Sequence, residues 1–195
     1  MKKIILTGCM AALTLLCVSA TDRRPVPAGI LRGLLEEKLE PRTRAFQAAK
    51  SQRESEIAQL LAIARQKQKV DEAYGARHLA IELLGEYRAD EQEVVQFLLD
   101  NITLRYNVVV SERSPLTGYA CATALSKIGQ LATYEISGRL EHDRTDKELE
   151  LYAHVIRQVD GEVTITRFRL ETRLKEADGA RKRNLEKMLG FLAKD

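Results

Sequence analysis

One short phrase occurs three times in this chain, and each copy ends at or just before a glycine. Residues 80–85 (AIELLG) match residues 124–129 (ALSKIG), and residues 155–160 (VIRQVD), followed at once by Gly161, form the third copy. Apolar residues in each copy stand at positions i and i+3, the spacing of one helix face. Glycine can adopt the left-handed conformation that closes a helix without a Cβ penalty. The phrase therefore predicts three helices that stop at or just after their glycines.

A second stretch of apolar residues at helical spacing follows each copy. The unit is therefore helix, tight turn, helix, and the phrases begin 44 and 31 residues apart. These intervals bracket the period of roughly 40 residues that is typical of HEAT and armadillo repeats. The apolar residues of the second helices are Val94, Val95, Leu98 and Leu99, then Leu131, Ile136 and Leu140, then Val163, Phe168, Leu170 and Leu174.

The second copy resembles the HEAT-repeat phrase, in which an Ala-Leu-x-x-Ile-Gly helix end leads into a helix with paired leucines. Residues 124–132, followed by Ile136 and Leu140, carry this resemblance, and residues 78–85 are similar to it too. The proline that usually follows the glycine is missing. The resemblance extends over about residues 71–175. The chain thus resembles a HEAT-repeat or armadillo-like protein, of the exported bacterial kind.

The resemblance implies an all-α fold, an α-solenoid of stacked antiparallel helix pairs. Residues 102–110 (ITLRYNVVV) depart from the pattern as an insertion rich in β-branched residues, which forms either a short strand or an irregular, extended loop. Residues 181–192 are expected to form a degenerate closing helix, as terminal repeats do. The expected organisation is a helical N-terminal segment at 30–70 and the repeat array at 71–195.

In HEAT-type proteins the second helices line the concave face, so the resemblance also implies a binding surface. The solvent positions of these helices form a mixed polar row that we predict to contact a partner. An ordinary solvated surface, which also mixes both signs of charge, is the alternative interpretation. The row consists of Gln92, Gln96, Glu135, Arg139, Arg169 and Arg173.

The first 20 residues are typical of a secretory signal peptide. Lys2 and Lys3 precede an apolar run, and small residues (VSA) stand at 18–20, where signal peptidase cuts. An uncleaved anchor is the alternative, and lipidation at Cys9, in the sequence LTGC, is a minor one. Residues 21–29, broken by prolines, are expected to be a disordered lead-in. We therefore predict an exported protein of the periplasm, the extracellular space or the cell envelope.

Composition excludes several classes of function. The chain has 195 residues, enough for one domain, and 31 Lys and Arg balance 28 Asp and Glu to a net charge of +3. A polybasic nucleic-acid binder is therefore not expected. The densest basic run, from Arg167 to Arg183, is interleaved with acidic residues, which favours a solvated helix face over a site for an acidic partner.

The sequence contains no pattern that carries catalytic or metal chemistry. It has no His-Glu-x-x-His, Cys-x-x-Cys, phosphate-binding Gly-x-x-x-x-Gly-Lys or Gly-x-Ser-x-Gly motif. His78, His142 and His154 are isolated and are expected at the surface or at helix caps. Cys121, in a small-residue helical stretch, is expected to be a buried, inert thiol.

These observations predict a non-enzymatic exported scaffold that binds a protein or peptide through its concave face. No cofactor, metal, catalytic residue, nucleic acid or stable membrane insertion after signal cleavage is expected. Two alternatives remain open. One is an enzyme or enzyme subunit with chemistry on the concave face, and the other is a purely structural envelope protein. The sequence does not specify the oligomeric state.

Overall fold

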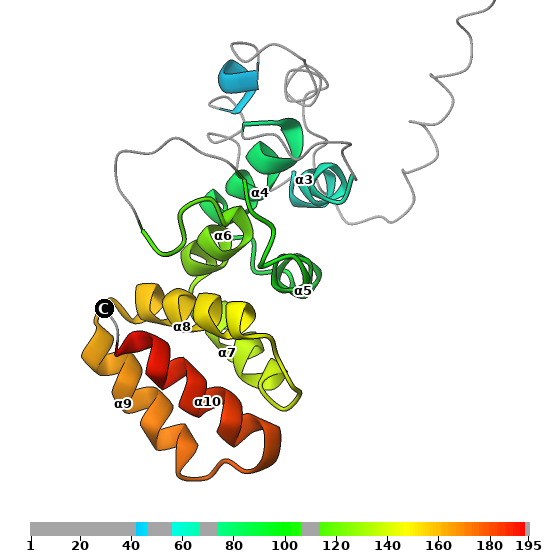
Figure 1. Cartoon of the computed structure of the whole chain (residues 1–195). Helices are drawn as coiled ribbons and strands as arrows, with labels where there is room; N and C mark the ends of the chain where they lie inside the picture. Colours follow the sequence, from blue (N-terminus) through cyan, green and yellow to red (C-terminus); the bar gives the residue numbers. More distant parts are fainter. Residues whose placement is uncertain (1–41, 47–55, 67–73, 107–113, 194–195) are drawn as a thin grey trace, which may run out of the picture.

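The computed structural model describes residues 42–46, 56–66, 74–106 and 114–193. Every regular secondary-structure element within these ranges is an α-helix, which confirms the all-α expectation (Figure 1). The expected signal peptide, lead-in and much of the N-terminal helical segment lie outside the described residues, as does the second half of the insertion.

The connections are short from α6 onward and longest between α5 and α6, which residues 101–119 join. Their bounds are α3 Ile57–Ala64, α4 Ala76–Glu86, α5 Gln92–Asp100, α6 Ala120–Ile128, α7 Gln130–Arg139, α8 Asp146–Asp160, α9 Val163–Leu174 and α10 Gly179–Leu192. Helices α4 and α5, α6 and α7, and α8 and α9 occupy the segments of the three units that the repeated phrase predicts. In the last two units the two helices pack on each other, whereas α5 packs on α6 and α7 rather than mainly on α4. Helix α10 covers the segment expected to close the array.

The helices pack in the order of the chain. The first helices of the three pairs follow one another, since α4 contacts α6 and α6 contacts α8. Helix α3 packs on α4 at one end, and α10 packs on both α8 and α9 at the other (Figure 1). The second helices α5 and α7 also touch. This packing is compatible with a helical bundle or a solenoid.

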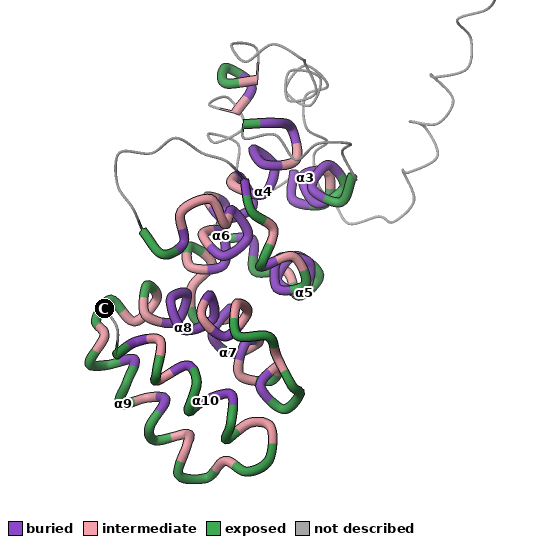
Figure 2. Tube along the Cα trace, in the orientation of Figure 1, coloured by how far each residue is buried: buried purple, intermediate pink, exposed green. Residues whose placement is uncertain are grey.

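The core lies mainly along the first helices. Figure 2 shows purple, buried stretches on α4, α6 and α8, and green, exposed stretches on α9 and α10. Residues 151–156 of α8 are all buried, because this helix has neighbours on several sides. Cys121 of α6 is fully buried, which confirms its expected place in the core.

Two of the three helix ends are formed by glycine as the phrase predicts. Gly161 follows α8 with φ of 81°, and Gly129 separates α6 from α7 with φ of 91°. At its other end α8 begins with a capping box, in which Thr145 and Glu148 each accept a hydrogen bond from the other's backbone N–H. Local sequence therefore sets the limits of α8.

Helix α4 ends just after Gly85, as the phrase predicts, but the expected left-handed conformation of this glycine is wrong. Helix α4 continues through Gly85 to Glu86, and Gly85 is not among the glycines with positive φ. A Cβ atom at Gly85 would lie 2.7 Å from Cα of Ala124 on α6. Glycine is therefore required here because two helix backbones approach closely, and not because the chain turns.

The described half of the insertion is irregular. Residues 101–103 form a turn and residues 104–106 have no regular structure. Ile102 and Tyr106 are nevertheless buried, and the backbone N–H of Tyr106 donates to the carbonyl of Gly118 at 2.7 Å. Over these residues the irregular alternative is confirmed, whereas residues 107–110 lie outside the described part of the chain.

We expect Gly85→Ala to lower the free energy of unfolding by about 1–3 kcal/mol, because the added methyl group overpacks the contact between α4 and α6. Urea unfolding followed by circular dichroism measures this change. Gly138→Ala is the matched control, since Gly138 lies near the end of α7 with no atom within 4 Å of an added Cβ. It should leave stability unchanged or raise it by about 0.5 kcal/mol. Equal stability of the two variants would contradict the proposed close contact.

Candidate functional site

The predicted polar row lies on the second helices. Five of its six side chains are half-buried, and only Gln92 is exposed. The row is thus less open to solvent than its sequence positions suggest. By helix, its members are Gln92 and Gln96 on α5, Glu135 and Arg139 on α7, and Arg169 and Arg173 on α9.

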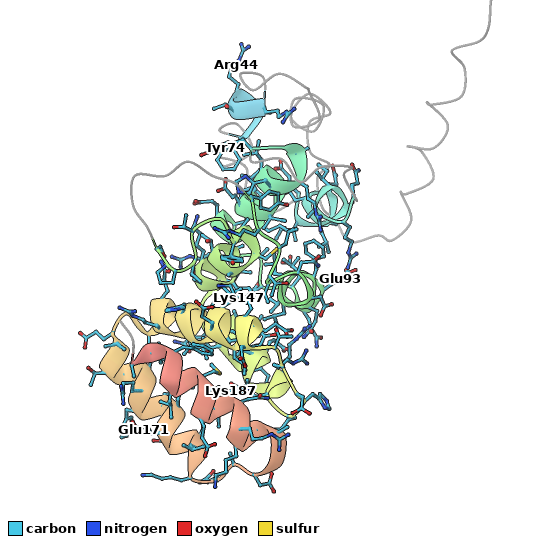
Figure 3. All side chains as sticks on the ribbon, viewed as in Figure 1. Arg44, Tyr74, Glu93, Lys147, Glu171 and Lys187 are labelled. Carbon is cyan, nitrogen blue, oxygen red and sulfur yellow. The ribbon has the colours of Figure 1, made fainter. Side chains whose placement is uncertain are left out.

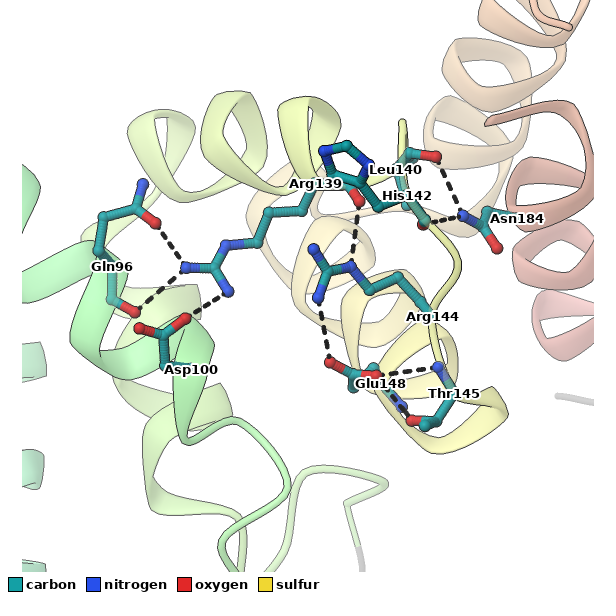
Figure 4. A network of polar contacts seen from close by, with 9 residues as sticks. All are labelled: Gln96, Asp100, Arg139, Leu140, His142, Arg144, Thr145, Glu148 and Asn184. Atoms are coloured by element: carbon teal, nitrogen blue, oxygen red, sulfur yellow. Dashed lines mark hydrogen bonds and ion pairs between the residues drawn. The ribbon is translucent and has the colours of Figure 1, made fainter. Parts of the chain in front are cut away.

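Members of the row on α5 and α7 bind one another across the helix boundary. Nε2 of Gln96 donates to Oε2 of Glu135 at 2.6 Å. Arg139 donates to the side-chain oxygen of Gln96 and pairs with Asp100 at 2.6 Å (Figure 4). The side chain of Arg139 is only 15% exposed, whereas that of Asp100 is 63% exposed, so the pair is open to water on its carboxylate side. These residues therefore stabilise the packing of α5 on α7.

The same network continues into the loop between α7 and α8. Nε of Arg144 donates to the carbonyl oxygen of Arg139 at 3.1 Å. From α10, Nδ2 of Asn184 donates to the carbonyls of Leu140 and His142 at 3.0 and 2.8 Å (Figure 4). Backbone carbonyls at and just after the end of α7, which have no hydrogen-bond donor within the helix, thus accept hydrogen bonds from α10.

The row on α9 is also linked to its neighbours. Arg169 pairs with the fully buried carboxylate of Asp160 at 2.7 Å and donates to Gln130 of α7 at 3.5 Å. Arg173 donates to the hydroxyl of Ser137, also on α7. Its guanidinium is half-buried, and in the described ranges no carboxylate lies within salt-bridge distance of it.

Much of the basic run has acidic partners within the chain. Three ion pairs connect α10 with the segment that joins α7 to α8 or with the start of α8. They are Arg181 with Glu141 at 3.0 Å, Arg183 with Asp143 at 2.8 Å, and Lys187, labelled in Figure 3, with Asp146 at 2.7 Å. Exposed pairs of this kind contribute little to stability, but they do compensate charge. The run is therefore not a broad basic surface.

Three large apolar side chains on the second helices are exposed. Tyr134 of α7 and Phe168 of α9 are each 71% exposed, and Ile165 of α9 is 46% exposed. The expectation that Phe168 belongs to the apolar core stripe is therefore wrong. The buried residues of α9 are Thr166 and Leu170, and Phe168 stands two positions from each, which is about 200° around a helix.

Sequence reasoning missed this surface, although the spacing contains a signal for it. Tyr134 stands midway between the buried residues Ala132 and Ile136, just as Phe168 stands midway between Thr166 and Leu170. A two-residue step from the buried stripe places each aromatic ring on the outer face. We call Tyr134, Ile165 and Phe168 the apolar patch.

The three histidines lie in different surroundings. His142 is exposed, as expected. His78 is buried and accepts a hydrogen bond on Nδ1 from the backbone N–H of Tyr74 at 2.9 Å, just before α4. This bond holds the residue before the helix and does not cap α4, whose N-cap is Gly75, and the expected surface position is wrong. His154 is also buried, which contradicts its expected surface position.

Two cavities adjoin the buried histidines. One has a volume of about 290 Å³ and is lined by His154, Arg157 and Gln158 of α8 together with the turn at 114–116. The other, of about 170 Å³, adjoins His78 and shares Leu116 with the first. Nδ1 of His78 already accepts a hydrogen bond from the backbone N–H of Tyr74, and this bond fixes the chain just before α4.

The described part of the chain holds neither a metal-binding cluster nor a candidate membrane span. Within it, no three His, Cys, Asp or Glu side chains are grouped so that they could hold a metal ion. None of the described helices has both the length and the apolar character needed to cross a membrane.

No protein-family model matches the sequence, and it has no significant match among curated proteins or solved structures. The resemblance to HEAT repeats therefore rests on residues 78–85 and 124–132 with the residues that follow them, and it stays a prediction.

Burial lowers the pKa of His78 from 6.5 to about 4. The contribution of His78 to the free energy of unfolding therefore depends on pH. Above pH 6.5 the ring is neutral in both states and the contribution is complete. Between pH 6.5 and 4 only the unfolded chain binds the proton, so stability falls as the pH falls. We expect a loss of about 2 kcal/mol at pH 5 relative to pH 7, measured by urea unfolding.

His78→Asn is the matched variant for this measurement, because its amide oxygen can accept the Tyr74 N–H but does not titrate. Glu82, 3.7 Å from Nε2, and the rings of Tyr74 and Tyr106 are the other groups that face His78, and they are retained in the variant. The difference in stability between the wild type and the variant should change with pH. An unchanged difference from pH 7 to pH 5 would contradict the assignment.

Proposed function

We propose that this chain is a non-enzymatic exported scaffold that binds a protein or peptide through the concave face of an α-solenoid of HEAT-like helix pairs. The second helices α5, α7 and α9 supply that face. The apolar patch carries the proposal, because two aromatic side chains and an isoleucine are exposed on α7 and α9.

The chemistry of the patch supports binding. Aromatic residues and arginine are enriched among the residues that dominate protein interfaces. Full burial of one such apolar side chain yields about 1.5–3 kcal/mol. Arg169 and Arg173 lie on the same helix as Phe168 and Ile165, so polar groups border the patch. An apolar centre with a polar rim is the usual anatomy of a protein interface.

The order of the helices supports the solenoid part of the proposal. Successive first helices contact one another, and α5 contacts α7. Helix α10 packs on α8 and α9, and it is the last helix of the described residues. Side chains bridge successive second helices at Gln96 and Glu135 and at Arg173 and Ser137. Each pair thus gains stability from its neighbours, as repeat arrays do.

Two buried ionisable groups with shifted pKa values have roles within the fold, which supports a scaffold rather than an enzyme. His78 holds the backbone of Tyr74 just before α4. The hydroxyl of Tyr87 donates to the buried carboxylate of Glu56 at 3.0 Å, and burial raises the pKa of Glu56 despite this hydrogen bond. This pair joins the end of α4 to the start of α3, so it stabilises the packing between them.

The proposal predicts a partner that contacts Phe168 directly. Benzoylphenylalanine placed at Phe168 and irradiated in the cells that make the protein should cross-link one discrete partner, identified by mass spectrometry. The same residue placed at Glu186, an exposed position of α10, is the control and should not cross-link that partner. Equal cross-linking from both positions, or none from Phe168, would contradict the proposed binding surface.

A further inference from the structure

Three arginines whose charges act on one another, Arg169, Arg173 and Arg181, have two ion-pair partners between them. Arg169 pairs with Asp160 at 2.7 Å and Arg181 pairs with Glu141 at 3.0 Å. Arg173 instead donates to the neutral hydroxyl of Ser137. We call Arg169, Arg173 and Arg181 the arginine cluster, and within the described residues it retains one positive charge without an ion-pair partner.

The free energy of this arrangement favours an added anion. Burial, followed by the charges of Arg169 and Arg181, lowers the pKa of the Arg173 guanidinium, while Asp160 acts in the opposite direction. A guanidinium nevertheless stays protonated at neutral pH. Nε of Arg181 is also buried without a hydrogen-bond partner in the described part of the chain. A bound carboxylate would relieve the cost at Arg173, since buried charges are stable only when paired.

The apolar patch lies on the same two helices as the groups around Arg173. On α7, Tyr134 is three residues before Ser137, so the two lie one helical turn apart. On α9, Ile165 is four residues before Arg169, which is again one turn, and Phe168 lies one turn after Ile165. A ligand that places an anion at Arg173 therefore has apolar surface within reach.

We propose that Arg173 binds a side-chain carboxylate of an acidic peptide segment, whose neighbouring apolar side chains pack on Tyr134, Ile165 and Phe168. This inference rests on the proposed function and specifies its ligand. Arginine and carboxylate form paired, charge-assisted hydrogen bonds, which provide geometric selectivity. The ion pairs of Arg181, Arg183 and Lys187 leave no broad basic stripe of the kind that a phosphate backbone requires.

A peptide selection tests the inference and does not require an identified partner. A phage library of random 12-residue peptides is selected against the immobilised full chain. We expect enriched peptides to carry Asp or Glu next to apolar residues. Selected peptides are then synthesised with each acidic residue and with its amide counterpart, and their affinities are measured by fluorescence anisotropy. The amide peptides should bind about tenfold more weakly, in keeping with one lost charge-assisted contact.

Arg173→Gln should lower the affinity for the acidic peptides about tenfold and leave the affinity for the amide peptides unchanged. Arg173→Lys, which keeps the charge but loses the planar fork, should lie between the wild type and Arg173→Gln. Arg167→Gln is the matched control, because Arg167 is an exposed arginine of the same helix, 3.9 Å from Glu171. It should change affinity less than twofold. Circular dichroism shows whether each variant retains the fold.

The outcomes separate this inference from the proposed function. Enrichment of apolar residues without acidic ones, with binding lost in Phe168→Ser, would overturn the carboxylate site and leave the binding surface intact. Acidic peptides that bind Arg173→Gln as tightly as wild type would overturn the role of Arg173. No enrichment of any peptide would overturn both proposals, as would binding of anionic phosphatidylglycerol vesicles in place of peptides.

Discussion

Helices α4 and α6 approach closely because Gly85 presents no side chain to the backbone of Ala124. This contact sets the spacing between the first two helix pairs, and the rest of the layer follows from it as α8 packs on α6 and α10 on α8. Small residues on α6, including the buried Cys121, serve the same close packing. The second helices α5 and α7 are then near enough for Gln96 and Glu135 to meet.

The polar bridges between second helices change how the concave surface is understood. Gln96, Glu135 and Arg139 are half-buried and bind one another or Asp100, so they serve mainly the contact between α5 and α7. The large apolar side chains that remain accessible lie further along the array, on α7 and α9. Binding energy in the proposed scaffold therefore comes from the apolar patch, and selectivity comes from the arginine cluster beside it.

Much of the fold could be predicted from the sequence because helix periodicity and helix ends are local properties. The helical segments of the three units and the glycine ends at Gly129 and Gly161 follow from the repeated phrase, and the closing helix follows from the pattern of residues 181–192. That α5 packs on α6 rather than mainly on α4 does not. The surroundings of His78 and the partners of the basic run could not be predicted, because they depend on residues about 30 to 40 positions away. Tyr106 packs on the ring of His78, and Glu141 pairs with Arg181. Phe168 is different, since its spacing alone contained the signal for exposure.

The order of residues along the chain is sufficient to specify which segments are helical, where α6 and α8 end, and that Cys121 lies in the core, because short-range spacing and backbone conformation decide these features. The packed structure was needed to show that Gly85 serves a helix contact, that the polar row bridges helices, and that Arg173 has no carboxylate partner in the described residues. These features could not be read from local sequence, because the pairing of side chains and their burial depend on which helix surfaces meet. Two helices with similar patterns can present the same residue type to water or to a neighbour, and packing alone selects between them.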